Sequence, residues 1–298
     1  MSLNHSAKAV PGGPEGGGPA VLLVDNGSLE PAATLSLRGL AERLGAVIER
    51  VVLPVSLLHS SAIAPERLDG RAAEILEPAL RGLAAAGVGE VVVVPLFLGP
   101  SGALTDYLPE RVRHLRKTWP GLRVRVAPCL VDAARPQDTR VAAMLAERVR
   151  ESAKSAGFTR PAVAVVDHGS PQRSVNAVRE LVTEQVRVLL GGWARMVAAC
   201  SMERRTGAEY DFNEPLLERL LDAPEFAMGE VVVAQLFLQP GRHAGPGGDV
   251  EKICAAAMKK NPGTKIAITE PLASHPGLVE VLKERVKEGR WAKAIYDE

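Results

Sequence analysis

Short apolar runs alternate along the chain with segments that have the period of a helix. The runs cover residues 21–25, 47–55, 91–97 and 124–127, and then 163–167, 196–200, 231–237 and 265–269. Between the first two runs, apolar side chains recur at i, i+3, i+4 and i+7, the spacing of one helix face. These side chains are Leu37, Leu40, Ala41 and Leu44. The alternation predicts parallel strands joined through helices.

The two halves of the chain form an internal repeat. Residues 20–28, AVLLVDNGS, match residues 162–170, AVAVVDHGS, and residues 89–100 match residues 229–240 in the same order. We therefore predict an α/β protein of two homologous lobes, each a four-stranded parallel sheet flanked by helices. The predicted parts are a flexible Gly/Pro-rich tail, an N-terminal lobe, a linker and a C-terminal lobe, at residues 1–19, 20–150, 151–160 and 161–298.

Composition and charge narrow the range of partners. The 298 residues include 36 Lys and Arg against 35 Asp and Glu, a formal charge of +1, so no net attraction to nucleic acid is expected. The apolar runs are shorter than the roughly 20 residues of a membrane-spanning helix, so we expect no membrane partner. The three cysteines form no Cys-x-x-Cys pair, which fits a reducing compartment, and the cytoplasm is the expected location.

Two histidines of the second half are the main candidates for chemistry. His168 follows the first strand of that half, and His243 follows the third. Because parallel strands present their carboxyl ends at one edge of a sheet, both imidazoles are expected on one rim, where they could bind a divalent metal. A single loop histidine is more often a turn residue or a solvated side chain. The first half, however, has Asn26 and Ala103 at the matching positions, so the fold does not itself require histidine there.

These motifs resemble a known family. Asp-His-Gly-Ser after a strand, an apolar strand ending in Leu-Phe-Leu, then Pro-Gly-Arg-His and a later Asp are similar to the class II chelatases of the sirohydrochlorin cobaltochelatase and ferrochelatase group. The resemblance covers roughly residues 20–288 and implies a tetrapyrrole substrate between the two lobes. It implies that His168 and His243 bind the incoming Co²⁺, Fe²⁺ or Ni²⁺, with no further cofactor, in cobalamin or siroheme biosynthesis. Unlike the long members of the family, this chain has its histidine pair in the C-terminal lobe, and its step from His243 to Asp249 is longer.

The resemblance also suggests roles for residues around the pair. Glu203 resembles the family's acidic residue and would act as an auxiliary base or third ligand, although an ion pair with a neighbouring arginine is equally consistent with its position. Sirohydrochlorin carries many carboxylates, and guanidinium groups suit them. Residues assigned to substrate binding are Arg204, Arg205, Arg242 and Ser170.

Two other functions and the oligomeric state complete the predictions. A non-catalytic protein that stores or delivers a metal or a tetrapyrrole is the alternative to a chelatase. A histidine phosphatase is disfavoured, because Asp167 directly precedes His168 and would repel a phosphate. The duplication already provides two facing lobes, so we expect a monomer whose partners are the tetrapyrrole and the metal.

Overall fold

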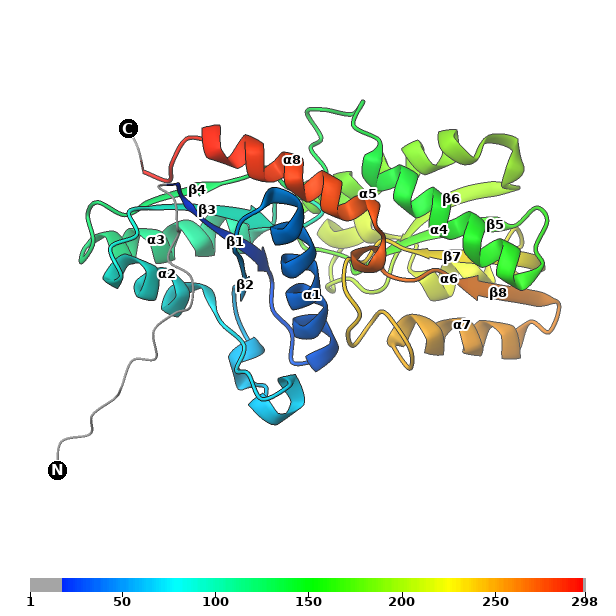
Figure 1. Ribbon diagram of the computed structural model, residues 1–298. Coiled ribbons are helices and arrows are strands. Elements are labelled where there is room, and N and C mark those ends of the chain that lie inside the picture. The colour runs from blue at the N-terminus through cyan, green and yellow to red at the C-terminus, as the bar shows by residue number, and fades with distance from the viewer. Residues whose placement is uncertain (1–17, 297–298) are drawn as a thin grey trace.

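The computed structural model describes residues 18–296 and contains two four-stranded sheets (Figure 1). The first sheet has the order β2-β1-β3-β4, and its strands are β1 (Ala20–Asp25), β2 (Val52–Ser56), β3 (Glu90–Pro95) and β4 (Arg123–Val126). The second has the order β6-β5-β7-β8, from β5 (Ala162–Asp167), β6 (Met196–Ser201), β7 (Gly229–Gln235) and β8 (Thr264–Ile268). All neighbouring strands are parallel, which confirms the predicted α/β fold. The predicted tail lies outside the described residues except for Gly18 and Pro19.

Helices cover both faces of each sheet. They are α1 (Pro31–Ile48), α2 (Leu76–Ala85), α3 (Leu108–Arg116), α4 (Arg140–Ala156), α5 (Arg173–Leu190), α6 (Leu217–Asp222), α7 (Asp249–Lys260) and α8 (Gly277–Trp291). Shorter helical turns lie at Ser60–Ala62, Pro65–Leu68, Ala103–Tyr107, Gly191–Trp193, Ala208–Asn213 and Leu272–Ser274. No helix within residues 18–296 is long and apolar enough to cross a bilayer.

Two predicted boundaries are wrong, and in both cases a helix runs further than expected. Helix α1 continues to Ile48 and ends at Glu49, whose backbone is left-handed with φ 53°, so the strand begins only at Val52 and not at residue 47. Helix α4 continues to Ala156, because Ala153 extends its buried face into the predicted linker. Gly157, with φ 71°, then ends the helix.

The two repeats exchange a helix. Helix α4 follows the first sheet in sequence but packs against β7, β8 and α5 of the second repeat. Helix α8 ends the second repeat but packs against β3, β4 and α1 of the first (Figure 1). One apolar cluster consequently runs through both repeats, from Val92 in β3 to Val232 in β7. A fully buried arginine of α8, Arg285, donates to the carbonyl oxygens of Cys129 and Leu130 beyond β4 and holds this exchange in place.

Candidate functional site

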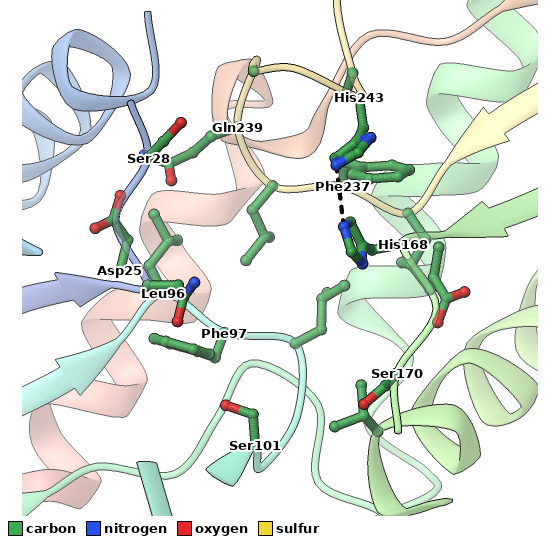
Figure 2. A pocket seen from close by; sticks show the side chains of 18 of the residues that line it. Asp25, Ser28, Leu96, Phe97, Ser101, His168, Ser170, Phe237, Gln239 and His243 are labelled. Carbon is green, nitrogen blue, oxygen red and sulfur yellow. Dashed lines mark hydrogen bonds between the residues drawn. The ribbon is translucent and has the colours of Figure 1, made fainter. Parts of the chain in front are cut away.

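The carboxyl ends of the two sheets face one cavity. It has a volume of about 620 Å³ and is lined by residues 25–28 and 96–99 of the N-terminal lobe and by residues 167–170 and 236–244 of the C-terminal lobe. These segments directly follow β1, β3, β5 and β7, the central strands of each sheet. Parallel strands that end together leave their loops free to bind a ligand, as expected for open α/β sheets. Figure 2 shows this cavity with the side chains of both lobes around it.

His168 and His243 meet on the C-terminal side of the cavity. Their Nε2 atoms lie 3.1 Å apart, and the two rings are nearly perpendicular at 79° (Figure 2). Two nitrogens that bind one metal ion at about 2.1 Å, with an angle between about 90° and 110°, are separated by roughly 3.0–3.4 Å. The pair therefore has the spacing of two ligands in one coordination sphere.

The outer nitrogens of both rings face acceptors. Nδ1 of His168 lies 3.1 Å from the carbonyl oxygen of Gly169, and Nδ1 of His243 lies 2.9 Å from Oδ2 of Asp249. A carbonyl and a carboxylate can only accept, so both rings can place their hydrogen on Nδ1 and offer the lone pair of Nε2 to a metal ion. The two Nε2 atoms are within hydrogen-bond distance of each other at 3.1 Å, and a metal ion bound between them would replace that contact. Despite the longer loop noted in the sequence, Asp249 thus lies beside His243.

A glycine turn presents His168, and the same turn exists in the other lobe. Gly169 has φ 90°, and a Cβ atom there would lie 1.9 Å from the carbonyl oxygen of Glu203. Gly27 has φ 88°, and its Cβ would lie 1.7 Å from the carbonyl oxygen of Leu58. Both positions therefore require glycine. Since the N-terminal turn has this shape without a histidine, the turn does not explain why His168 is present.

Glu203 lies beside the pair rather than in the cavity wall. Its Oε1 is 3.7 Å from Nε2 of His168, and its side chain is 62% exposed. Within residues 18–296, no group of three or more His, Cys, Asp or Glu side chains is arranged to hold a metal. The role of Glu203 as third ligand or base stays a prediction.

The residues assigned to substrate binding divide into two groups. Arg242 and Ser170 line the cavity, and the Arg242 side chain is 79% exposed and lies 3.6 Å from Asp249. Arg204 instead forms ion pairs with Asp211 and, at 2.9 Å, with Glu214. Arg205 stacks over the ring of Tyr210.

Two buried aspartates line the cavity, one at the end of each lobe's central strand. Asp167 accepts hydrogen bonds from Ser201 and from the backbone of Gly169, and lies 3.6 Å from the buried guanidinium of Arg179. Asp25, the matching residue of β1, has no ion pair among the described residues, and burial raises its pKa to about 6. The sequence patterns did not single out Asp25 as a site residue. The repeat alignment does place it over Asp167, and that match was the available signal.

Comparison with known proteins settles the family. The family model named CbiX matches residues 20–152 and again residues 162–289, which together make up most of the chain. The protein belongs to the CbiX family. The resemblance to the class II chelatases is thereby confirmed, and each repeat corresponds to one copy of the family's domain. No curated protein matches the chain.

Solved structures share the bilobal fold of this CbiX family member. "SirB from Bacillus subtilis with Fe3+" matches with a TM-score of 0.65 at 16% identity, covering 91% of this chain and 95% of that chain. The sirohydrochlorin chelatase SirB from Bacillus subtilis subspecies spizizenii in complex with cobalt matches with a TM-score of 0.63 at 15% identity, over 92% and 95%. CbiX, described as the terminal enzyme of siroheme biosynthesis in denitrifying bacteria, has a TM-score of 0.57 at 16% identity, over 90% and 98%.

Proposed function

We propose that this CbiX family protein inserts a divalent metal ion, Co²⁺ or Fe²⁺, into a sirohydrochlorin-type tetrapyrrole. Family membership and the fold shared with sirohydrochlorin chelatases support the reaction class. The observation that carries the proposal is the convergence of the Nε2 atoms of His168 and His243, which lie 3.1 Å apart. Imidazole suits cobalt, iron and nickel alike, so the two ligands do not by themselves select the metal. The preferred metal is the one that the protein inserts fastest.

The geometry supports a simple order of events. The metal binds between His168 and His243, held by two neutral nitrogens that can be exchanged for those of the macrocycle. The tetrapyrrole enters the cavity between the lobes and presents its ring nitrogens to the metal. Arg242 lies at the rim, exposed enough to pair with a peripheral carboxylate. As the metal passes to the ring, the two inner N–H groups lose their protons, and one metal chelate and two protons are formed.

The other assigned arginines would have a smaller part in substrate binding. Arg204 would have to exchange its ion pairs with Asp211 and Glu214 for a substrate carboxylate, and Arg205 would have to leave Tyr210. Such an exchange gains little free energy at the surface, because an exposed ion pair contributes only about 0–1 kcal/mol. Arg242 also has an acidic neighbour, Asp249 at 3.6 Å, but it is the one of the three that lines the cavity, so we expect it to contribute most to binding.

An anaerobic insertion assay tests the proposal. Purified protein, incubated with sirohydrochlorin and Co²⁺ or Fe²⁺, should change the visible spectrum faster than the metal alone does and through many turnovers. His168→Ala should abolish this acceleration. His114→Ala is the matched control, because His114 is exposed on α3 and lies outside the cavity, and it should keep the parent rate. A spectral change that stops at one equivalent per protein would instead identify a binding and delivery protein.

A further inference from the structure

Metal insertion needs a proton acceptor, and the metal-loaded histidine pair cannot be that acceptor. Each Nε2 gives its lone pair to the metal, and each Nδ1 carries a hydrogen toward the Gly169 carbonyl or Asp249. Neither ring then has a free lone pair for a proton from the macrocycle. The metal and the two histidines also occupy one face of the macrocycle. A group that takes a ring proton has to face the cavity from elsewhere.

Asp25 has the required position. It is the last residue of β1 in the N-terminal lobe, and it lines the same cavity as the histidine pair. Figure 2 shows its carboxylate on the side of the cavity away from His168 and His243. Asp25 is only 4% exposed, and it is one of the residues that form the cavity wall.

The surroundings of Asp25 leave it able to accept a proton. Its hydrogen bonds come from neutral groups, namely the backbone N–H of Gly27 at 3.0 Å and the side chains of Ser56 and Gln239. Within residues 18–296, no ion pair involves Asp25. Asp167, its counterpart, is held by Arg179, whereas the residue 142 positions before Arg179 is the apolar Leu37. The N-terminal lobe has thus kept the buried carboxylate without the cation that would neutralise it.

We propose that Asp25 is the base that takes the first inner proton of the tetrapyrrole, on the face turned away from the histidine pair. This inference rests on the proposed chelatase function. The N–H bond breaks, its electron pair stays on the ring nitrogen as a donor to the metal, and the proton moves to the carboxylate of Asp25. The second N–H, made more acidic by the metal already bound to the ring, loses its proton to water. Asp25 returns its proton to solvent when the product leaves.

The electrostatic environment fits a base that works near neutrality. Burial is the main cause that raises the pKa of Asp25, to about 6, so the group is mostly ionised above that pH and still basic enough to accept a proton. The neighbours from β2, α1 and the loop after β7 are Ser56, Ala33 and Gln239, all uncharged. The charged and titratable residues that otherwise line the cavity come from the C-terminal lobe, and they are Asp167, His168, Arg179, Arg242 and His243.

Asp25→Asn tests the inference, because it keeps the size of the side chain and an acceptor for Gly27 but removes the base. We expect kcat to fall about 10²-fold or more, the usual contribution of general base catalysis, with KM for metal and macrocycle within about twofold. The decline of kcat at acidic pH should vanish with the carboxylate. Asp25→Glu should restore part of the rate and shift this decline. Glu30→Gln, an exposed carboxylate before α1 and outside the cavity, is the control and should behave as the parent.

The outcomes separate this inference from the function on which it rests. If the parent protein turns over but Asp25→Asn keeps its kcat and its pH profile, Asp25 is not the base and the chelatase proposal stands. A rise in KM with unchanged kcat would also overturn the inference, since it would make Asp25 a binding group only. If Asp25→Asn does not fold, an unchanged acidic decline in Asp25→Glu would overturn the inference instead. A parent protein without turnover would overturn both proposals.

Discussion

Each lobe has the same kind of glycine turn at the carboxyl end of the central strand of its own sheet, but the turns carry different side chains. In both, an aspartate ends the central strand and a glycine with positive φ follows two residues later, donating its N–H to that aspartate. Between them the C-terminal lobe has His168, and the N-terminal lobe has Asn26. The backbone of the turn is thus a property of the fold, whereas the side chain that the turn presents differs between the lobes. Comparing two copies of the turn in one chain distinguishes what the fold requires from what a particular function requires, which the fold alone does not do.

The second difference lies beneath the turn. Arg179 of α5 is buried and reaches Asp167, Ser201 and the carbonyl oxygen of Phe212, so it ties the turn to the segment that follows β6. The matching residue of α1 is Leu37, which packs in the apolar cluster and leaves Asp25 without a charged partner. One lobe therefore holds its aspartate in a buried network of ionic and hydrogen-bonding contacts, and the other keeps it as a buried acid without an ion pair.

Removing the histidine of the equipped turn should have the largest effect. His168→Ala takes away one of the two proposed metal ligands, and because metal positioning is worth several kcal/mol, we expect insertion to slow about 10³-fold. The rate of chelate formation under anaerobic conditions measures this. Asn26→His in the same variant should not restore the rate, since residue 103, where a second histidine would be needed, lies in a helical turn outside the cavity. Recovery in that double variant would show that the two turns are interchangeable.

Replacing Arg179 with leucine, the residue at the matching position of the N-terminal lobe, should have the second largest effect. It should lower the stability of the folded protein. Arg179→Leu leaves Asp167 buried and unpaired, which costs about 3–5 kcal/mol when one partner of a buried ion pair is lost. Urea denaturation would show the lower free energy of unfolding. Arg187→Leu, on the same helix and largely exposed, is the control and should change it much less. Equal losses in both variants would contradict the role assigned to the buried network.

Asp249→Asn should weaken metal binding without abolishing it. The carboxylate of Asp249, 2.9 Å from Nδ1 of His243, would favour the ring tautomer that can bind the proposed metal through Nε2, and the loss of such an outer partner lowers affinity by about 10–100-fold. Titration with Co²⁺, followed by its visible absorption, measures the affinity. Asp222→Asn, which only breaks an exposed pair with Lys260, serves for comparison and should leave the affinity unchanged. An affinity for Co²⁺ in Asp249→Asn equal to that of the parent would show that the carboxylate does not tune the ring.

The smallest effect is expected for the replacement of Asp25 by asparagine, which should make the folded protein more stable. Burial holds the pKa of Asp25 at about 6, above its ordinary value of 3.8, so the ionised group destabilises the folded protein. Stability contributed by its protonated form is complete below about pH 4 and is lost as the pH rises through 6. Asp25→Asn should therefore raise the free energy of unfolding by about 2 kcal/mol at pH 7.5 and by little at pH 4. Thermal unfolding at both pH values measures this difference, and a lower Tm at pH 7.5 would contradict it.

The sequence was sufficient for the sheets and for the histidine pair, because both follow from short-range patterns. Apolar runs mark the strands, and parallel strands bring His168 and His243 to one rim. The exchange of α4 and α8 could not be predicted, since an amphipathic pattern shows that a helix has an apolar face but not which sheet that face covers. Arg204 was assigned to the substrate because of its charge. The turn Ala208–Asn213 and the loop after it bring Asp211 and Glu214 against Arg204, a contact between loops that no periodic pattern encodes.

The exchanged helices also decide how the molecule would behave if its backbone were broken in the middle. A protease that cut between Gly157 and Pro161 would break the covalent link between the two halves. Helix α4 of the first fragment would still pack on the sheet of the second fragment, and α8 of the second fragment would still pack on the sheet of the first. Separation would require Val149 of α4 and Val286 of α8 to leave the apolar cluster they share. Such a nicked protein should remain a single particle and keep the cavity between its lobes, whereas either half produced alone would leave one face of its sheet uncovered.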